Sequence, residues 1–599
     1  MSRPLPPSAT SLAALQVGAV PSPVELSKGV VGQAGSRDAL AQLTAAMSEL
    51  REMAIQPILQ RAVAFLQADD FRSGGDWAIK ALEKDERSGF AWYLLGIARE
   101  RAGDFASSLS AYEAALKLLP DHVEIANDLG RLAYRLGMPP QAEKLFRHFL
   151  ARYPDSAEAA NNLACAIREQ GRTDEATEIL RAAITKNPEI AMLWNSLGTV
   201  LAEQGDFPTA DIFFSEALKL DPDFPKARYN HGNALLAQGD AAGALAECDE
   251  ALRATIGEDD RQMMRLARST ILIALGCIGM GWDEYEARLD HQFSGVTHFS
   301  VERPQWKPGD DLAGKSLLVI GEQGLGDEML FANLLGDVQD ALGADGRLTI
   351  AVETRLVDFF QRSFPRATVC AHATYVVQGR LVRVVPQIDE MDSIDLWTPM
   401  GSLLRQFRRD LASFPDHAGY LKADPARVAY WRAVLKTAPA GPKVGLLWKS
   451  AVSRDARHRY FSPFQNWAPV LAEKGVTFVN LQYGDCSVEI AQAREEMGVE
   501  IWTPPGIDLK QDLGEVAALC CAMDLVLGFS NATFNIAAAC GVPAWLISTP
   551  GAWPRLGCAD RYPWYPQVRV WAPETFGDWA TPMAAVAAEL AEFAAGKER

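Results

Sequence analysis

The most informative shortage in this sequence is one of positive charge. Lys and Arg total 58 residues against 76 Asp and Glu, a formal net charge of -18 at pH 7. A general nucleic-acid binder normally presents a basic face, so this balance argues against that class and predicts no nucleic-acid partner. No segment is long and apolar enough to span a bilayer, and we therefore expect no membrane span.

Cysteine is also scarce, and its distribution excludes two kinds of site. The nine cysteines include no Cys-x-x-Cys pair and have no companion histidine cluster, which argues against a disulfide framework and a zinc site. The first 35 residues or so are rich in Pro, Ser, Gly and Ala, and lack the basic start and apolar core of a signal peptide. We therefore expect a cytoplasmic protein and no bound metal.

The chain has enough material for several domains. Its 599 residues exceed what one core accommodates, and 48% apolar with 22% charged residues is ordinary for a globular protein. We expect residues 1–50 to be disordered or partly helical, and the rest to fold.

A repeat of 34 residues begins near residue 55. The recurring prolines are Pro120, Pro154, Pro188 and Pro222, and the recurring small residues are Gly96, Gly130, Ala164, Gly198 and Gly232. Small residues let two helices approach closely, and a proline ends the second helix of each pair. The pattern resembles the tetratricopeptide repeat. The resemblance implies a superhelix over residues 51–295, in which residues 259–295 cap the array.

Such an array commonly holds a protein in its concave groove, and we expect it to bind a protein acceptor. Polar side chains on the first helix of each repeat are the candidates, because an amide offers a donor and an acceptor to an extended peptide backbone. They are Asn127, Asp128, Asn161, Asn162, Asn195, Asn230 and Asn233. A scaffold without a specific ligand, with incidental asparagines, stays open as the alternative.

After a turn-rich junction at residues 303–310 the rhythm of the sequence changes. Short apolar runs alternate with amphipathic ones, which predicts parallel sheets built from βαβ units. The expected strands are 316–320, 348–352 and 367–370 in a first series, and 443–448, 477–482, 501–502, 525–528 and 544–547 in a second. The predicted fold is thus α plus α/β: helical repeats, then two Rossmann-like domains at 296–425 and 426–575, and a C-terminal helix within 576–599.

A glycine-rich turn, Gly321-Glu-Gln-Gly-Leu-Gly-Asp327, follows the first expected strand and precedes a helix expected at residues 328–343. A strand that leads through such a turn into a helix presents free backbone N–H groups, which suit an anion. The spacing is neither a Walker A motif nor a full Gly-x-Gly-x-x-Gly. A phosphate cradle and a turn that only packs the sheet are equally open readings of this stretch.

Further motifs carry a family resemblance. Together with the glycine-rich turn, residues 444–449 (Val-Gly-Leu-Leu-Trp-Lys), 480–485 (Asn-Leu-Gln-Tyr-Gly-Asp) and 535–543 resemble the heptosyltransferase-like GT-B glycosyltransferases. The whole layout is similar to the bacterial flagellin glycosyltransferases. That resemblance implies that the repeats bind flagellin and that a nonulosonic acid of the pseudaminic-acid type passes from a CMP-linked donor to Ser or Thr, without a cofactor. Alternatives are an O-GlcNAc-transferase-like enzyme that uses a UDP-sugar, and a repeat adaptor with an inactive GT-B scaffold.

The resemblance places the acceptor's catalytic base at Asp327, beside Gly324 and Gly326, with Glu322 and Glu328 as runners-up. Asp327 could instead be only the N-cap of the following helix. As a carboxylate at a helix N-terminus, it is expected to take the proton late in the reaction.

The donor is expected in the second α/β half. The resemblance makes Lys449 a phosphate contact, and the basic loop after it suits phosphate and carboxylate groups, although a structural ion-pair patch is the alternative. Gln482 and Tyr483 are expected to contact the nucleobase or ribose of the donor, or else only to form the wall of the crevice. Trp564 and Tyr565 are expected to pack in the core. Ser530 and Asn535 depart from the family's acidic residue and histidine, which fits either a more anionic donor or lost activity. The remaining donor candidates are Arg454, Arg457, Arg459, Asn531 and Thr533.

Overall fold

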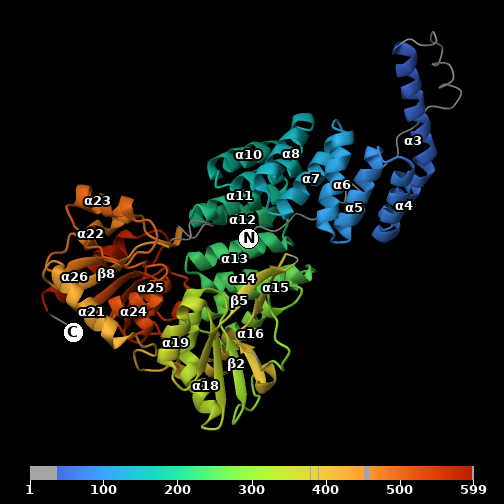
Figure 1. Ribbon diagram of the computed structural model, residues 1–599. Coiled ribbons are helices and arrows are strands. Elements are labelled where there is room, and N and C mark those ends of the chain that lie inside the picture. Colours follow the sequence, from blue (N-terminus) through green and yellow to red (C-terminus); the bar gives the residue numbers. More distant parts are fainter. Residues whose placement is uncertain (1–36, 378, 389, 451–458, 597–599) are drawn as a thin grey trace. The chain divides into compact units, whose positions relative to one another are not determined.

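The computed structural model describes residues 37–377, 379–388, 390–450 and 459–596 of the chain (Figure 1). The chain divides into two compact units, Met1–Val200 and Leu201–Arg599, and each is described by itself. The division falls inside α11, so helical repeats occur in both units.

The repeat region consists of antiparallel helix pairs. In the first unit they are α3 (Arg37–Gln67), α4 (Phe71–Lys84), α5 (Gly89–Arg101), α6 (Phe105–Leu118), α7 (Val123–Arg135), α8 (Pro139–Arg152), α9 (Ala157–Arg168), α10 (Thr173–Lys186) and most of α11 (Ala191–Glu203). In the second unit they are α12 (Phe207–Leu220), α13 (Pro225–Ala237), α14 (Ala241–Arg253), α15 (Glu258–Ala274), α16 (Ile278–Tyr285) and the short helix η1 (Glu286–Leu289).

The repeated residues do what their chemistry predicts. A Cβ added to Gly96 would lie 2.6 Å from the ring of Tyr112, and one added to Gly130 would lie 2.9 Å from the ring of Phe146. Only a glycine therefore lets each helix of these pairs approach so closely. The four prolines each follow the end of a helix by two residues, at α6, α8, α10 and α12, as predicted.

The α/β region holds two parallel sheets and a small mixed one. The first parallel sheet has the order β4-β3-β2-β7 and the second has the order β12-β11-β10-β8-β9. The strands of the first are β2 (Ser316–Ile320), β3 (Arg347–Val352), β4 (Thr368–Ala371) and β7 (Leu396–Pro399). The strands of the second are β8 (Lys443–Leu447), β9 (Thr477–Asn480), β10 (Leu525–Phe529), β11 (Ala544–Ile547) and β12 (Val568–Trp571).

The third, three-stranded sheet has the order β1-β6-β5, in which β1 and β6 are parallel and β5 and β6 form a hairpin. Its strands are β1 (Thr297–Phe299), β5 (Ala373–Val377) and β6 (Arg380–Val384). The sequence patterns did not predict this sheet, nor β7 and β12. The expected strand at 501–502 is only a single bridge, between Val479 and Trp502.

Helices cover the sheets. The first sheet carries α17 (Leu325–Phe331), α18 (Leu335–Leu342), α19 (Val357–Ser363) and α20 (Leu404–Phe407), with the short helices η2 (Ala332–Leu334), η3 (Thr354–Leu356), η4 (Met391–Ser393), η5 (Met400–Leu403) and η6 (Leu411–Ser413). The second carries α21 (Pro425–Val434), α22 (Ala468–Leu471), α23 (Ser487–Met497), α24 (Leu513–Cys520), α25 (Ala532–Ala539) and α26 (Ala580–Ala594), with η7 (Leu435–Thr437), η9 (Phe464–Trp467) and η10 (Trp553–Arg555).

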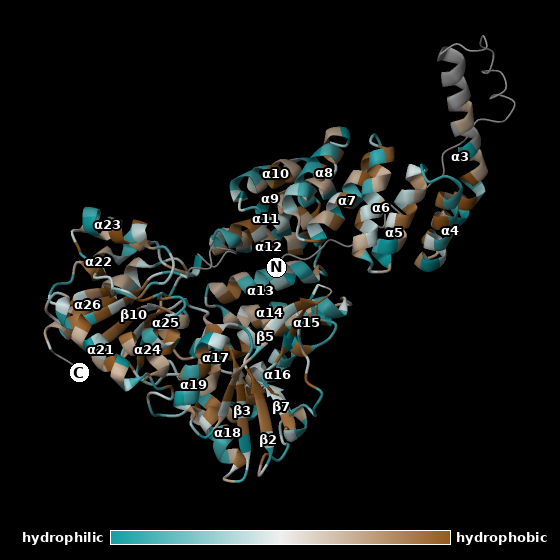
Figure 2. Ribbon diagram, viewed as in Figure 1, coloured by the Kyte–Doolittle hydropathy of each residue, from teal (hydrophilic) through white to brown (hydrophobic). Residues whose placement is uncertain are grey.

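Apart from Ser316, the residues of β2 and β10 are apolar or glycine, and the central strands are drawn largely in brown in Figure 2. Every residue of β2 and of β10 is buried, as expected for strands covered on both faces. One apolar core runs through both α/β halves and reaches Trp282 of α16, whose indole N–H donates to the Arg408 carbonyl at 2.9 Å. The end of the repeat region and the two sheets of the second unit are therefore packed as one body.

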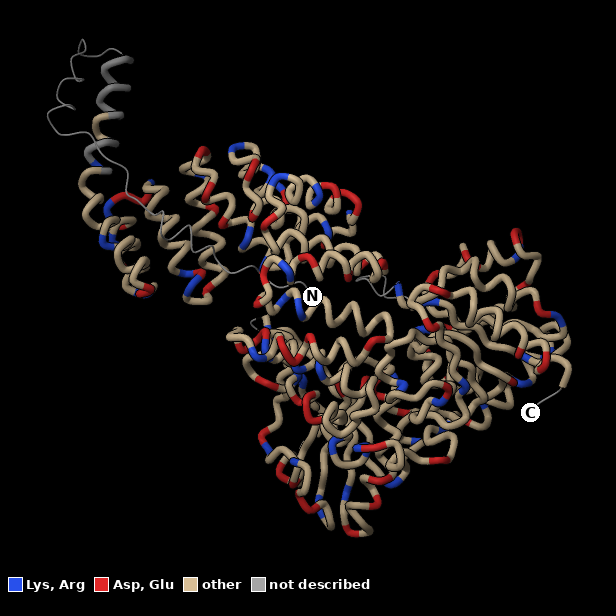
Figure 3. Tube along the Cα trace, turned by 180° about the vertical axis from the view of Figure 1, so that it is seen from behind, with Lys and Arg blue, Asp and Glu red and all other residues tan. Residues whose placement is uncertain are grey.

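In the view of Figure 3, basic and acidic residues are interspersed along the described chain. Among the described helices, none combines the length and the apolar character needed to cross a bilayer.

Candidate functional site

The candidate site lies where the carboxyl ends of the two parallel sheets meet. In each sheet the strand order reverses once, between β2 and β7 in the first and between β8 and β10 in the second. Ligands of open α/β sheets bind at such reversal points, because neighbouring loops leave in opposite directions and open a crevice. The glycine-rich turn follows β2, Lys449 follows β8 and Ser530 follows β10.

A buried ion pair holds the start of the glycine-rich turn. The carboxylate of Glu322 accepts from Arg288 Nε and Nη2, both at 2.7 Å, and from the Gly401 backbone N–H at 2.6 Å. Burial alone would lower the pKa of Arg288, but the charge and hydrogen bonds of Glu322 raise it above its usual range. Glu322 is therefore a fixed internal partner.

Glu328 is buried in a second polar cluster. Its carboxylate contacts His372 Nε2 at 2.8 Å and accepts from the Glu353 backbone N–H at 2.9 Å. A Cβ on Gly321 would come within 2.5 Å of this carboxyl group, so the turn requires a glycine there. Both runner-up acids, Glu322 and Glu328, are thus buried and hydrogen-bonded within the protein.

The turn carries one residue with an unusual backbone. Gln323 is exposed and has a φ of 61°, a left-handed conformation that costs a non-glycine residue on the order of 1 kcal/mol or more. The next residue, Gly324, is the N-cap of α17. The helix therefore starts at Leu325, three residues before the start at 328 that the sequence predicted.

Asp327 is the third residue of α17 and not its N-cap. Its carboxylate accepts from the Gly324 backbone N–H at 3.2 Å, and it is only partly buried. Burial chiefly raises the pKa values of Tyr285 and Tyr562, and the negative charge of Asp327 adds to both increases. Asp327 thus lies between a phenol of the repeat cap and a phenol of the second α/β half.

The second half contributes the start of α25. Asn531 caps this helix, accepting from the Phe534 N–H at 3.0 Å, while its own amide group donates to the Lys449 carbonyl at 3.4 Å. Asn535 accepts from the Tyr565 hydroxyl at 2.9 Å and donates to the Asn531 carbonyl at 3.0 Å. Asn531 is therefore the N-cap of α25.

The two halves touch at this point. A Cβ added to Gly326 would lie 3.3 Å from the amide nitrogen of Asn535. Ser530 is exposed and hydrogen-bonds to the Tyr562 hydroxyl, and the charge of Asp327 helps to raise the pKa of the same hydroxyl. The structure therefore brings together Gly324, Gly326, Asp327, Ser530, Asn531 and Asn535, which the sequence singled out separately.

Two other residues predicted to contact the sugar donor, Lys449 and Gln482, have internal partners. The Lys449 ammonium pairs with Glu489, and the Gln482 amide oxygen accepts from the backbone N–H groups of Trp448 and Lys449, at 3.1 and 3.0 Å. Gln482 thereby ties the end of β9 to the loop after β8. Thr533 is buried in α25, and Tyr483 is half-buried beside Gln482.

Arg459 points away from this crevice. Its guanidinium donates to the Ala202 carbonyl at 2.6 Å and lies over the ring of Phe207 at 5.4 Å, so it binds the helical repeats of the second unit. Arg459 therefore has a structural role, although its contacts are with a carbonyl and an aromatic ring and not the ion pairs that the sequence offered as the alternative for the basic loop. Arg454 and Arg457 lie outside the described residues.

The repeat asparagines differ in their partners. In the first unit, the side-chain oxygens of Asn127 and Asn161 and both polar atoms of Asn162 lack a hydrogen-bond partner among the described residues. Asp128 accepts from Tyr93 at 2.7 Å and from Arg131 at 2.6 Å, so its carboxylate is engaged internally. The other candidates are Asn195, which is buried, and Asn230 and Asn233, which are half-buried.

Sequence reasoning missed Arg288, Tyr285 and Tyr562. Their partners at the site lie far along the chain: Ser530 is 32 residues from Tyr562, and Glu322 is 34 residues from Arg288. The aromatic run Arg-Tyr-Pro-Trp-Tyr-Pro at 561–566 is a usable signal for Tyr562, although the sequence predicts only packing for Trp564 and Tyr565. That prediction holds for Trp564, which is fully buried among Trp282, Phe331 and Phe414.

The fold and these contacts define a class: a tetratricopeptide-repeat protein whose repeats lead into an α/β region of Rossmann-like parallel sheets. A family model for the tetratricopeptide repeat matches residues 59–123, 93–157, 127–188, 162–213 and 197–259. Over its full length the chain is similar to Protein FlbA of Caulobacter vibrioides (strain ATCC 19089 / CIP 103742 / CB 15). The two are 49% identical over 588 residues, which is 98% of each chain. The chain therefore belongs to the FlbA family.

Two solved structures match about a quarter to a third of this chain. A crystal structure of MamA is 27% identical and covers 26% of this chain and 93% of its own, with a TM-score of 0.24. PilW, a type IV pilus biogenesis factor, is 21% identical and covers 33% of this chain and 91% of its own, with a TM-score of 0.30. At these TM-scores neither structure supports an argument about this chain.

Proposed function

We propose that this protein is a metal-independent protein O-glycosyltransferase that docks its acceptor on the repeats. The donor is a CMP-activated nonulosonic acid, the acceptor groups are Ser or Thr hydroxyls, and the acceptor protein is flagellin. The observation that carries the proposal is the convergence of Asp327 with the start of α25, at the carboxyl ends of two parallel sheets.

Asp327 is the acid best suited to the acceptor hydroxyl. Glu322 and Glu328 are buried and hydrogen-bonded, whereas the carboxylate of Asp327 is only partly buried. Its bond to the Gly324 N–H fixes its orientation at the mouth of the turn. A carboxylate held in this way can accept the hydroxyl proton as the new bond to the sugar forms.

The part of the site that would bind the sugar donor consists of neutral hydrogen-bonding groups around the start of α25. Ser530 and the capped helix start offer hydroxyl and backbone N–H groups to a phosphate or carboxylate. An acidic side chain at position 530 would repel a donor that carries both a phosphate and a sugar carboxylate. The serine there favours such an anionic donor, and Lys449 would contact its phosphate after exchanging Glu489 for it.

The repeats supply acceptor binding through unsatisfied amides. Buried polar groups normally have hydrogen-bond partners, and leaving one unpaired costs about 1–3 kcal/mol. The oxygens of Asn127 and Asn161 are unpaired at equivalent positions of adjacent repeats, 34 residues apart in the sequence, and Asn162 is unpaired at both polar atoms. Of these, Asn127 is half-buried and within reach of an extended peptide backbone laid along these helices, whereas Asn161 and Asn162 are buried.

One substitution tests whether Asp327 acts as a base or only stabilises the start of α17. Asp327→Asn keeps an oxygen that accepts the Gly324 N–H, so the helix start is retained while the basic carboxylate is lost. We expect transfer to purified flagellin to fall about 10²–10⁴-fold with an unchanged melting temperature. Asp358→Asn, in the first turn of α19 in the same half, is the matched control and should retain activity.

Transfer by Asp327→Asn at the wild-type rate would show that the carboxylate only caps the helix. Wild-type protein without any transfer, and without stabilisation by CMP, UDP or ADP sugars, would instead identify an inactive scaffold. A donor present at 100 times its dissociation constant stabilises the protein by about 2.7 kcal/mol, which a thermal-shift assay detects.

A further inference from the structure

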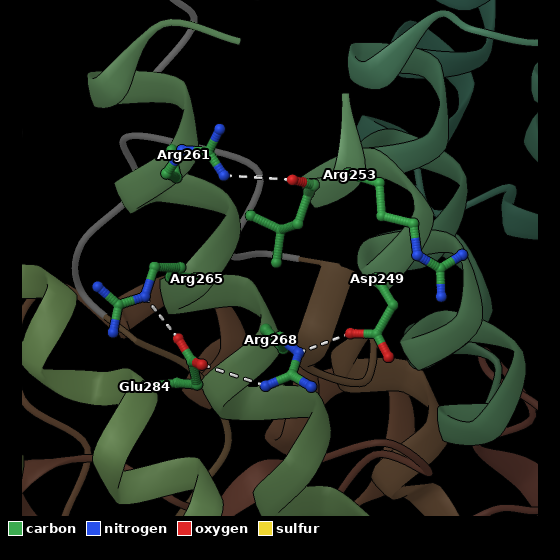
Figure 4. Close-up of a pocket in the computed structure, with 7 residues that line it drawn as sticks. Asp249, Arg253, Arg261, Arg265, Arg268 and Glu284 are labelled. Carbon is green, nitrogen blue, oxygen red and sulfur yellow. Dashed lines mark hydrogen bonds and ion pairs between the residues drawn. The ribbon is translucent and has the colours of Figure 1, made fainter. Parts of the chain in front are cut away.

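An arginine-lined pocket lies between α14 and α15, at the end of the repeats and outside the site described above. It is an open pocket of about 340 Å³ (Figure 4). Its lining residues are Asp249, Leu252, Arg253, Arg261, Arg265, Arg268 and Glu284.

Helical spacing explains how the positive charge gathers here. Arg261, Arg265 and Arg268 stand at positions i, i+4 and i+7 of α15, so all three lie on one face of the helix. Arg253 faces them from the end of α14 (Figure 4). Like charges at these spacings destabilise a helix, so this arrangement needs acidic partners or a ligand.

The arginines of the pocket have acidic partners. Glu284 accepts from Arg265 Nε at 2.7 Å and from Arg268 Nη1 at 3.1 Å, and Asp249 accepts from Arg268 Nε at 2.6 Å (Figure 4). The lining holds four arginines and two acids, and the other two arginines pair with acids just outside it, Arg253 with Glu250 and Arg261 with Glu258 at 3.6 Å.

The arginines also keep hydrogen-bond donors available. Their contacts with described residues use Nε and Nη1: Arg261 Nη1, for example, donates to the Leu252 carbonyl at 3.2 Å, and Arg253 Nη1 pairs with Glu250. Within the described part of the chain, none of the four Nη2 groups has a hydrogen-bond acceptor. Guanidinium groups bind carboxylates with two parallel hydrogen bonds, so these N–H groups suit a further carboxylate.

The pocket is directly connected to the glycine-rich turn. Glu284 lies in α16, and Arg288, four residues further along the chain, donates two hydrogen bonds to Glu322 of the turn. A polypeptide anchored at the pocket would therefore be held by the helical segment that supports the site.

We propose that this pocket binds carboxylate side chains of an acidic segment in the acceptor polypeptide. The proposal rests on the proposed function in taking the acceptor as the partner of the repeats. The pocket already holds the carboxylates of Asp249 and Glu284 with the same guanidinium chemistry, and its open form admits side chains of a bound chain. Acidic residues near the modified Ser or Thr would then favour an acceptor.

The test measures peptide binding without any sugar transfer. Fluorescein-labelled hexaglutamate is titrated with the full-length protein, and hexaglutamine of the same length is the control probe. We expect anisotropy to rise with hexaglutamate only, and 0.5 M NaCl to weaken its binding because exposed charges are screened.

The variant to compare is Arg253→Gln/Arg261→Gln, which keeps the internal pairs of Arg265 and Arg268. It should bind hexaglutamate about tenfold more weakly, as expected for two lost charge-assisted contacts. The matched control, Arg181→Gln/Arg494→Gln, removes two exposed arginines that are also paired with acids, and should bind like the wild type.

Equal losses in both double variants would show nonspecific attraction and overturn the proposal. So would binding of hexaglutamate no tighter than that of hexaglutamine, or wild-type affinity in the pocket variant. Because no step needs donor or catalysis, failure here leaves the proposed transfer standing. Loss of transfer in Asp327→Asn, in turn, leaves hexaglutamate binding unchanged.

Discussion

The buried pair of Arg288 and Glu322 gives the sharpest stability prediction. Arg288 belongs to η1, the last element of the repeat cap, and Glu322 belongs to the glycine-rich turn. Besides its two bonds to Glu322, the guanidinium donates to Ser402 Oγ at 3.0 Å and lies 4.1 Å from the centre of the Tyr285 ring. The substitution Arg288→Met keeps the length and apolar stem of the side chain but removes the charge.

The structure sets the size of the effect. In Arg288→Met the Glu322 carboxylate stays buried with one remaining donor given by the structure, the Gly401 N–H at 2.6 Å. Removing one partner of a buried ion pair costs about 3–5 kcal/mol, because an uncompensated charge remains in the interior. In Arg288→Met/Glu322→Gln no fully buried charge remains, because Glu286, the other acid paired with Arg288, is partly exposed and also faces Arg405 at 3.7 Å. The double variant should therefore recover about half or more of that loss.

Thermal unfolding followed by tryptophan fluorescence measures this prediction, because Trp282 lies in the same core as the turn. At roughly 2 °C per kcal/mol for a large domain, Arg288→Met should lower the melting temperature by about 6–10 °C. The matched control is Arg409→Met, which breaks a pair with Asp283 that is 48% and 42% exposed and should cost about 2 °C or less.

Two outcomes would refute the reasoning. One is a shift in Arg288→Met no larger than that in Arg409→Met, which would mean that the buried charge is hydrated or neutralised after the substitution. The other is additivity in the double variant, which would mean that Arg288 and Glu322 contribute independently.

Two further predictions concern the repeats. Burial lowers the pKa of His231, but its hydrogen bonds with Glu247 and Asp211 outweigh burial and raise it. The stabilisation is therefore complete below the unfolded pKa of about 6.5 and is lost as the pH rises through the folded value. His231→Gln should lower the melting temperature more at pH 6 than at pH 9, and equal losses would contradict this. For Asn127→Ala we expect weaker flagellin binding but a melting temperature within about 2 °C of the wild type, because its side-chain oxygen has no partner among the described residues and the residue is only half-buried. Leu129→Ala, at a buried position of the same helix, should cost about 2–5 kcal/mol, and an equal loss in both variants would argue against a binding role for Asn127.

Local periodicity predicted much of the fold. The repeat helices and the central strands at 316–320, 443–448 and 525–528 carry regular apolar patterns, and the structure places each of these three strands within a residue of its predicted ends. Strand β5 could not be found in this way, because its last four residues are exposed and do not alternate between buried and polar. Its pairing with β6 alone makes it a strand.

The site was predicted in pieces. The glycine-rich turn and the Ser530–Asn535 segment are motifs of a few residues each, so the sequence displays them. The start of α17 was placed too late, because its cap is a glycine without a side chain that could signal a cap. Three roles stay predictions: that Asp327 is the base, that Lys449 contacts the sugar donor, and that the repeat asparagines bind an acceptor protein.

The sequence by itself determined the repeats, the parallel α/β halves and the candidate acids, since these depend on spacing along the chain. Only the tertiary structure decided which acid is accessible. Glu322, Asp327 and Glu328 lie within seven residues of one another, yet two are enclosed by Arg288 and by His372, while Asp327 meets Tyr562 of the other half. These partners come from distant parts of the chain, and packing of the apolar core, not local sequence, brings them into contact.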